Sequence, residues 1–414
     1  MREPKARAYD ILDKINEYMR EYTDVLDKPR RKYMRDMILG SIRSNSLILS
    51  QIAQKVQQIT DKCANSHQTE KRLSYNLNSE KWSIIGMCDK HYHSMLEYAT
   101  DDTLIILDLS DIQKPYGRKL PDLKDVRDGS TGDIGLGYHL VSGLLRINRR
   151  MIFPLWLDSF STDEVGFKSQ NWEIMDIVKS IFSVTGYRGI LVYDSYLDIG
   201  HIFTDLLDMH IHFVIRLKGN RMLSFQTGKA IVDNMMKTQK LRYSSMISVK
   251  RPRRRGKKYW KLSYDYYPVT LPGRDDDQLY LIVARREGKS EPIYLLVSVP
   301  ISCAKDALRW VKGYFSRWGI EDTFRFWKQR FCLEDIRTTD IDNFKKLLWI
   351  AVVAFAFMTI YLLTDLKLRR ELISLTHRPR LAKDIAFLYY RIQKGVDKLF
   401  EIFSAELLEE NWAT

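Results

Sequence analysis

The sequence TLIILDLS, residues 103–110, is an apolar run that leads into an aspartate, Asp108. A second run of this kind, GILVYDS at residues 189–195, leads into Asp194. Other strand-like runs and helical stretches accompany these two, at residues 138–147, 151–160, 172–182, 198–208 and 210–218. Three strands, a helix, a strand, a helix and a strand predict an α/β domain in which antiparallel strands continue into parallel crossovers.

The rest of the chain shows a different pattern on each side of this domain. Residues 1–98 have apolar side chains at three- and four-residue spacing, which predicts a small helical domain. Residues 219–299 contain short alternating runs separated by PGRDDD and EGKSEP, which predict a β-rich insertion. Helical patterns return afterwards. We therefore expect a core formed by residues 99–218 and 300–370, interrupted by the insertion and followed by a helical region at 371–414.

The charge of the chain favours a polyanionic partner. The 414 residues include 66 Lys and Arg against 52 Asp and Glu, which gives a net charge of +14 at pH 7. Fifteen of these cations and a single acid, Asp233, lie between residues 212 and 262, and RPRRRGKK at 251–258 is the densest point. This excess predicts a surface that contacts nucleic-acid phosphates in preference to an anionic membrane. With 45% hydrophobic and 29% charged residues, the composition excludes wholesale disorder.

One apolar segment raises the question of a membrane span. LLWIAVVAFAFMTIYLL at residues 347–363 has seventeen residues without a charge, which is the lower limit for crossing a bilayer. Basic residues lie on both sides of it and the other segments are amphipathic, so we expect a buried core helix and no membrane partner. Four cysteines without a CxxC pair, and a polar start to the chain, predict a cytoplasmic protein.

The most informative stretch is YFSRWGIEDTFRFWK at residues 314–328. Its polar residues Tyr314, Arg317, Glu321 and Lys328 fall at offsets 0, 3, 7 and 14. On a continuous helix from Ala304 to about Gln329, which advances about 100° per residue, these four side chains share one face. On this helix alone, an ordinary ion pair between Arg317 and Glu321 on a solvated face explains the pattern equally well.

The two aspartates at strand ends favour a functional site over an ordinary ion pair on a solvated face. Carboxylates at the ends of adjacent strands of an α/β sheet meet in one crevice, and a helix that carries Glu321 can close over Asp108 and Asp194. Three carboxylates repel one another, so such a group is stable chiefly when cations neutralise it. Hard oxygen ligands suit Mg²⁺ or Mn²⁺. Two such ions can promote the in-line displacement of a phosphodiester.

The same residues resemble a known signature. The pattern Y-x2-R-x3-E-x6-K at residues 314–328 resembles the YREK signature of the bacterial insertion-sequence DDE transposases, the insertion sequence four family of cut-and-paste type with an RNase H-like core. LDLSDIQKP around Asp108 and LVYDS around Asp194 resemble the two aspartate motifs of that family. The resemblance covers roughly residues 100–365 and includes a β-rich insertion between the second aspartate and the glutamate.

The resemblance implies a role for each of these residues. Asp108, Asp194 and Glu321 would be the catalytic triad that binds two Mg²⁺ ions, with Mn²⁺ as a substitute. The remaining signature residues would contact DNA-end phosphates, and these are Tyr314, Arg317 and Lys328. The implied reaction is hydrolysis at each transposon end followed by strand transfer into target DNA. The implied assembly is a homodimer on paired inverted repeats, in a bacterial cytoplasm and associated with the nucleoid. The helical domain of residues 1–98 would be the part that binds the DNA ends and recognises these repeats.

Three acids compete with the triad positions. Asp111 lies three residues after Asp108, and we favour Asp108 because Asp111 follows the strand, where the chain turns outward. Asp198 and Asp322 are weaker rivals, because each would point away from the converging face.

Four further residues resemble family positions that approach DNA. Arg216, Lys218 and Arg221 leave the last core strand in VIRLKGNR, although they also suit an ordinary basic hairpin surface. Tyr294, in the strand before the signature helix, stands where some relatives have a tryptophan that stacks on a flipped base. It suits a core aromatic position equally well.

Two other functions fit parts of the pattern. A non-catalytic DNA-binding repressor derived from a transposase would keep the basic surface and need no metal. An RNase H-like nuclease would cut DNA without strand transfer. The presence of all three acids together with the signature residues favours the transposase.

Overall fold

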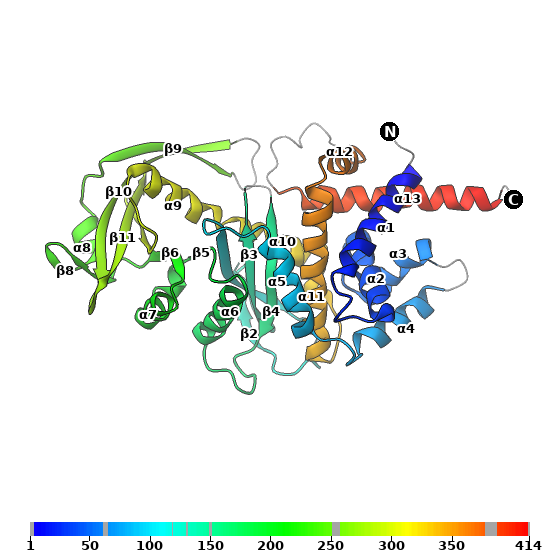
Figure 1. Ribbon diagram of the computed structural model, residues 1–414. Helices are drawn as coiled ribbons and strands as arrows, with labels where there is room; N and C mark the ends of the chain where they lie inside the picture. Colours follow the sequence, from blue (N-terminus) through cyan, green and yellow to red (C-terminus); the bar gives the residue numbers. More distant parts are fainter. Residues whose placement is uncertain are drawn as a thin grey trace. The chain divides into compact units, whose positions relative to one another are not determined.

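The computed structural model describes residues 4–60, 65–117, 119–129, 131–148, 151–250, 257–376 and 387–412 (Figure 1). The chain forms two compact units. The first combines Met1–Tyr98, Leu109–Gln170 and Asp322–Thr414, and the second combines Ala99–Asp108 and Asn171–Glu321. The five-part division expected from the sequence stays a prediction.

The first unit begins with helices, as the spacing of apolar residues predicts. They are α1 (Pro4–Arg20), α2 (Lys28–Ser44), α3 (Leu49–Thr60), α4 (Ser66–Leu77) and α5 (Ile84–Leu96). The ends of α2 show why it forms where it does. Asp27 caps its first turn by accepting a hydrogen bond from the Arg30 amide, and Asn45 ends it in a left-handed conformation, with φ of 54°. Ile11, Ile15 and Tyr18 of α1 are fully buried.

Strands of the first unit lie in the order β2-β3-β1, and β4 also pairs with β3. Their bounds are β1 (Leu104–Gln113), β2 (Lys124–Arg127), β3 (Ile134–Arg146) and β4 (Ile152–Phe160). Both β2 and β4 run antiparallel to β3. Strand β1 contributes to both units, because it continues past the unit boundary at Asp108.

The long apolar segment forms a core helix of the first unit. Helix α11 (Ile341–Phe357) continues into the π-helical segment η3 (Met358–Leu363). Within the described residues, this is the one helix long and apolar enough to cross a membrane, and 83% of its apolar window is buried inside the protein. It packs against β4 and α2 (Figure 1). The remaining helices of this unit are α12 (Leu366–Ser374) and α13 (Tyr389–Trp412). Burial accounts for the apolar character of α11, as the core-helix interpretation predicts.

The second unit has a larger sheet in the order β1-β5-β6-β12-β11-β10-β7-β8, with β9 paired to β10. The strands that follow β1 in this order are β5 (Ile190–Tyr193), β6 (His212–Leu217) and β12 (Ile293–Val297). The strands between β6 and β12 in sequence are β7 (Met222–Phe225), β8 (Gly228–Ile231), β9 (Tyr243–Lys250), β10 (Lys257–Leu271) and β11 (Arg274–Arg286). Strands β1, β5 and β6 are parallel to one another, whereas β12, β11 and β10 are antiparallel to their neighbours.

Helices connect the parallel strands of this unit. The crossover helix α6 (Gln170–Val184) precedes β5, and the short helix η1 (Ser195–Leu197) and α7 (Gly200–Asp208) join β5 to β6. Helix α8 (Val232–Met236) follows β8, and α9 (Ala304–Ser316) packs against β9, β10 and β11 (Figure 1). Helix α10 (Gly319–Arg330) follows and continues into the first unit, where η2 (Leu333–Asp335) comes next.

The observed strands confirm the mixed α/β class, and their order is consistent with an RNase H-like core. The β-rich insertion expected at residues 219–299 contains β7 to β12, and it extends the sheet of the second unit by pairing β12 with β6. The basic tract RPRRRGKK spans residues 251–258, and residues 251–256 of it lie outside the described residues.

Candidate active site

Two aspartates lie at the same edge of the sheet in the second unit. Strands β1 and β5 are parallel, and their register pairs Leu104 with Ile190 and Ile106 with Val192. Asp108 and Asp194 each come two residues after the second of these pairs. Because parallel strands end at the same edge, this register brings the two carboxylates side by side, as the sequence predicts.

The strand residues before these aspartates explain their placement. In β1 the residues 105–107 are buried, and in β5 all four residues are buried. Asp108 and Asp194 are partly exposed. Asp194 also caps η1, since its carboxylate accepts a hydrogen bond of 2.8 Å from the Tyr196 amide. Burial of the strands therefore fixes the backbone while the carboxylates stay accessible.

The single helix expected over residues 304–329 is wrong. The structure has α9 and α10 with a break between them. At the break, the Arg317 amide donates to the Tyr314 carbonyl and the Ile320 amide donates to the Arg317 carbonyl, each three residues back. Such bonds tighten a helix end, and Gly319 has a low helix propensity. The projection of four signature residues onto one continuous helix therefore does not hold.

Arg317 lies at this break and pairs with Asp108. Its Nη1 donates to Asp108 Oδ2 in an ion pair whose side chains are 10% and 16% exposed. The guanidinium also lies over the ring of Tyr314, 5.9 Å from the centroid, and Tyr314 is itself buried. Arg317 is therefore held between an aromatic ring and the first aspartate.

The electrostatics of Arg317 bring in the other two carboxylates. Burial lowers the pKa of the Arg317 guanidinium, but nearby groups raise it more, so this pKa lies above its ordinary value. The groups that outweigh burial are Asp108, Tyr314, Asp194 and Glu321. All three predicted triad members therefore act on one guanidinium. Glu321 itself is exposed, near the start of α10.

Tyr193 forms the buried side of this cluster. Its ring is 1% exposed, and its hydroxyl has no hydrogen-bond partner among the described residues. Burial raises the pKa of Tyr193, and the negative charges of Asp108 and Asp194 raise it further. The phenol therefore stays neutral, and its hydroxyl is a potential hydrogen-bond donor.

The donors of this cluster suit a hard cation, although they do not form a closed metal site. Carboxylate oxygens are the ligands that Mg²⁺ and Mn²⁺ prefer. In the part of the chain that the structure describes, no three His, Cys, Asp or Glu side chains are grouped closely enough to hold an ion. The guanidinium of Arg317 balances the charge of Asp108 in this arrangement.

Lys328, the last signature residue, belongs to the first unit. Its Nζ lies 3.3 Å from Asp111 Oδ2, and the Gly129 amide approaches Asp111 Oδ1 at 3.4 Å. The two candidates for the first aspartate therefore have different partners. Asp108 pairs with Arg317, whereas Asp111 pairs with Lys328.

The two weaker rivals have internal partners. Asp198 accepts hydrogen bonds from Arg221 Nε and from the Lys218 amide, both at 2.6 Å, and its side chain is 1% exposed. Asp322 lies 3.6 Å from Arg325. The carboxylate of Asp198 therefore joins the segment after β5 to the turn after β6.

Residues expected to approach DNA differ in their exposure. Arg216 and Lys218 have exposed side chains at the end of β6. Arg221 pairs with Asp198 and lies over the Phe203 ring, 5.5 Å from its centroid. A DNA contact by these three residues stays a prediction.

Tyr294 is buried in β12. Its side chain is 4% exposed, and its hydroxyl donates to Asp233 Oδ1 at 2.8 Å. Burial raises the pKa of Tyr294, and the hydrogen bond to Asp233 raises it further. The ring is covered in this structure, and its predicted stacking on a DNA base stays a prediction.

An aromatic cluster next to Arg317 was missed by the sequence reasoning. Trp260 of β10 contacts Phe315 and Trp318, with ring centroids 5.6 Å apart in each case. Arg286 lies over the Trp260 ring at 4.2 Å. Phe315 and Trp318 lie close to Arg317 in the sequence. Trp260 is too distant along the chain for a local pattern to predict its contact with them.

The comparisons with known proteins apply to this part of the chain. Residues 172–357 match the transposase DDE domain. The matched DDE domain segment includes Asp194, the β-rich insertion and the whole stretch 314–328, and it supports a DDE transposase. It covers slightly less than half of the chain and begins after Asp108.

Two other comparisons with known proteins give less support for a function than the DDE domain match does. No curated protein matches the chain. A cryo-EM structure of the piggyBac transposase synaptic complex with hairpin DNA aligns with 99% of this chain and 82% of its own, at 10% identity and a TM-score of 0.47. A likeness at this level carries no inference about function.

Proposed function

We propose that this protein is a DNA transposase of the insertion-sequence type, with Asp108, Asp194 and Glu321 as its catalytic carboxylates. The observation that carries the proposal is the parallel register of β1 and β5, which places Asp108 and Asp194 at one sheet edge, where Arg317 pairs with Asp108. Two of the three carboxylates, Asp194 and Glu321, lie inside the segment that matches the DDE domain.

The reaction proposed is hydrolysis of a phosphodiester at each transposon end, followed by attack of the freed 3′-hydroxyl on target DNA. The carboxylates would hold two Mg²⁺ ions, or Mn²⁺ in their place, and these ions would supply Lewis-acid catalysis. Arg317 would contact a phosphate of the DNA end, because a guanidinium binds phosphate oxygens as well as it binds a carboxylate. Tyr314 would orient Arg317 through its ring.

The assembly proposed is a homodimer on two paired DNA ends, because two ends must be cut and joined together. Arg216 and Lys218 are the exposed cations that would contact DNA beside β6. A bacterial cytoplasmic protein, associated with the nucleoid, fits this role.

The test is cleavage of a labelled duplex that carries the DNA flanking the coding sequence, with Mg²⁺ or Mn²⁺. Glu321→Gln keeps the size of the side chain but removes its charge, so DNA binding should persist. We expect cleavage to fall by more than about 100-fold, since even the outer-shell partners of metal ligands affect activity by 10- to 100-fold. Asp176→Asn, at an exposed position of α6, is the matched control and should cut normally.

Three other outcomes would contradict parts of the proposal. Binding without cleavage under either metal would favour the DNA-binding repressor. Cleavage without joining of the 3′-hydroxyl to target DNA would favour the nuclease. Cleavage by Glu321→Gln at the rate of the intact protein would remove Glu321 from the active site.

A further inference from the structure

Three aromatic rings of the second unit join the β-rich insertion to the break between α9 and α10. Trp260 lies in β10, Phe315 lies near the end of α9, and Trp318 lies in the break. The Trp260 ring meets each of the other two edge-on, with centroids 5.6 Å apart and planes at 84° and 83°. Phe315 and Trp318 also contact each other, at 5.3 Å. Each ring therefore contacts both of the others.

The sheet of the insertion fixes Trp260 in place. Its backbone pairs with Ile247 of β9, and two residues later β10 begins to pair with β11, at Leu262 and Arg286. The guanidinium of Arg286 lies over the Trp260 ring, with Cζ 4.2 Å from the centroid. The ring is therefore a fixed partner for the two aromatic residues beside the break.

The backbone of the break depends on such a partner. The Arg317 amide donates to the Tyr314 carbonyl at 3.0 Å, and the Ile320 amide donates to the Arg317 carbonyl at 2.9 Å. Hydrogen bonds across three residues have poorer geometry than those of an α-helix, and Gly319 has a low helix propensity. An α-helical ladder does not fix the direction of the residues here, so side-chain packing has a large part in doing so.

Arg317 lies within the segment that the aromatic rings hold. Phe315 precedes it by two residues and Trp318 follows it directly. Its guanidinium contacts Asp108 through Nη1, and the two side chains are 10% and 16% exposed. Its Nε is buried and has no hydrogen-bond partner among the described residues. Because a guanidinium held at one end can swing about that contact, its direction depends on where the backbone of Arg317 is held.

We propose that Trp260 is a positioning residue for Arg317. By packing against Phe315 and Trp318, it holds the break in the conformation that directs the guanidinium to Asp108. The consequence for DNA cleavage rests on the proposed function, because a displacement of about 1 Å in an active site can lower a rate by about 100-fold. The β-rich insertion thus contributes to the active site through packing as well as through its charge.

The first test measures the pair of Arg317 and Asp108 without DNA or metal. Urea unfolding of the full chain gives the midpoint shift that Arg317→Gln causes, once in the intact protein and once in Trp260→Ala. With Trp260 present, the change breaks an aligned ion pair, whereas without it the pair is already misaligned. The shift in Trp260→Ala should therefore be at most about half the shift in the intact protein. Trp260→Leu keeps more apolar volume and replaces Trp260→Ala if the latter does not fold.

Two further variants separate positioning from a general loss of stability. Trp260→Phe keeps a ring that can contact both partners, so it should restore the full midpoint shift. Tyr243 of β9 is a half-buried aromatic of the same insertion, and its ring contacts Tyr264 and Tyr266 of β10. Tyr243→Ala is the matched control. It should unfold at lower urea than the intact protein and leave the shift caused by Arg317→Gln unchanged.

The second test measures cleavage of the duplex with the flanking element ends, at a temperature where circular dichroism shows every variant to be folded. Trp260→Ala should cut about 10- to 100-fold more slowly at saturating DNA, because the position of Arg317 at the reacting bond is lost. Trp260→Phe should recover most of the rate, and Tyr243→Ala should cut at the rate of the intact protein. A merely structural role of Trp260 would leave the rate of the folded protein unchanged.

Three results would overturn the proposal. An equal midpoint shift in Trp260→Ala and in the intact protein would show that the ion pair forms without Trp260. An equal reduction of the shift in Tyr243→Ala would show a general loosening of the insertion. Cleavage by folded Trp260→Ala at the intact rate would remove Trp260 from any role in the reaction. The urea comparison needs no DNA, so failure of the proposed function, seen as no cleavage by the intact protein, is recognised separately.

Discussion

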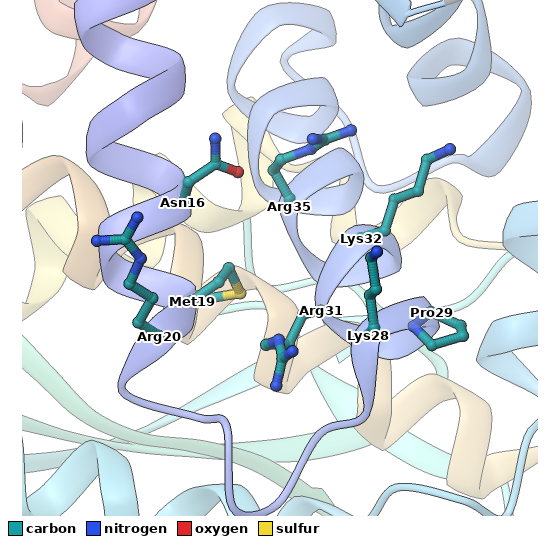
Figure 2. Close-up of a pocket in the computed structure, with 8 residues that line it drawn as sticks. All are labelled: Asn16, Met19, Arg20, Lys28, Pro29, Arg31, Lys32 and Arg35. Carbon is teal, nitrogen blue, oxygen red and sulfur yellow. The ribbon is translucent and has the colours of Figure 1, made fainter.

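The carboxylate cluster of the second unit differs in its charge pairing from a basic hollow between α1 and α2 of the first unit (Figure 2). In the cluster, the Arg317 guanidinium pairs with Asp108, and nearby acids raise its pKa against the effect of burial. Five Lys or Arg residues line the hollow, and three of them, Arg20, Lys28 and Lys32, are exposed and lack acidic partners among the described residues. Charges that are paired within the protein have their geometry fixed before any ligand arrives, as chemistry at one bond requires. An unbalanced surface gives affinity for a polyanion and little positional control.

The largest expected effect is on DNA cleavage, and it tests whether Asp108 or Asp111 belongs to the carboxylate cluster. Asp108→Asn should reduce DNA cleavage by more than about 100-fold, because it removes a proposed metal ligand. Asp111→Asn is the matched control, since Asp111 pairs with Lys328 instead of Arg317. Its cleavage rate, measured on the same labelled duplex, should fall much less. The reverse ranking would move the active site to Asp111.

A second prediction concerns the stability that the Arg317–Asp108 pair contributes. Arg317→Gln leaves Asp108 without its guanidinium, and the pair is only 10% and 16% exposed. Urea unfolding should show a decrease in stability of about 1–3 kcal/mol, because the remaining carboxylate is partly desolvated. The double variant Arg317→Gln with Asp108→Asn should recover part of that decrease in a double-mutant cycle. Additive effects would show that the pair does not couple.

A buried cation of the first unit sharpens the contrast with the exposed lysines of the hollow. Lys114 is 1% exposed, and its Nζ donates to the carbonyls of Leu333, Glu334 and Ile336 at 2.8–3.2 Å. Burial lowers the pKa of Lys114 from 10.5 to about 7. Between these two pH values the unfolded chain binds more protons at this residue than the folded chain does. Stability from this group therefore rises as pH increases through that window.

The matching measurement is urea unfolding of the intact protein and Lys114→Met between pH 7 and pH 10. The difference between their unfolding free energies should change by up to about 1.4 kcal/mol per pH unit, in favour of the intact protein at higher pH. A difference that stays constant with pH would show that Lys114 remains charged when buried.

The smallest expected effect concerns the unbalanced surface itself. Lys28→Gln with Lys32→Gln removes one like-charge pair at four-residue spacing and two unfavourable charges near the start of α2. The free energy of unfolding should rise by about 0.5 kcal/mol relative to the matched control Lys71→Gln with Lys81→Gln, which removes two exposed charges elsewhere in the helical region. A lower free energy of unfolding in the Lys28→Gln, Lys32→Gln variant would mean that these two lysines stabilise the fold.

Local sequence patterns predicted the elements that are buried on both sides. The run before Asp108 and the run before Asp194 are continuous and apolar, and both form buried strands. The same reasoning correctly placed α6, α7 and the core helix α11. Such elements are predictable because burial of their own side chains decides their conformation.

Features that depend on contacts distant in sequence were not predicted. Arg317 and Asp108 are 209 residues apart, and the break between α9 and α10 depends on local bonds that helical periodicity does not reveal. The basic hollow was missed for another reason. The cations of KPRRKYMR at residues 28–35 were visible, but the charge excess was assigned to residues 212–262, and only the packing of α1 against α2 creates a hollow.

The most direct test of the central claim is Mn²⁺ binding to the purified protein, measured by electron paramagnetic resonance without DNA. The account predicts that the intact protein and Asp176→Asn bind Mn²⁺ equally, and that Asp194→Asn binds it at least about tenfold more weakly. Arg317→Gln should bind it more tightly, because the competing guanidinium is removed. Equal affinity in the intact protein, Asp194→Asn and Arg317→Gln would contradict a cation site formed by these carboxylates.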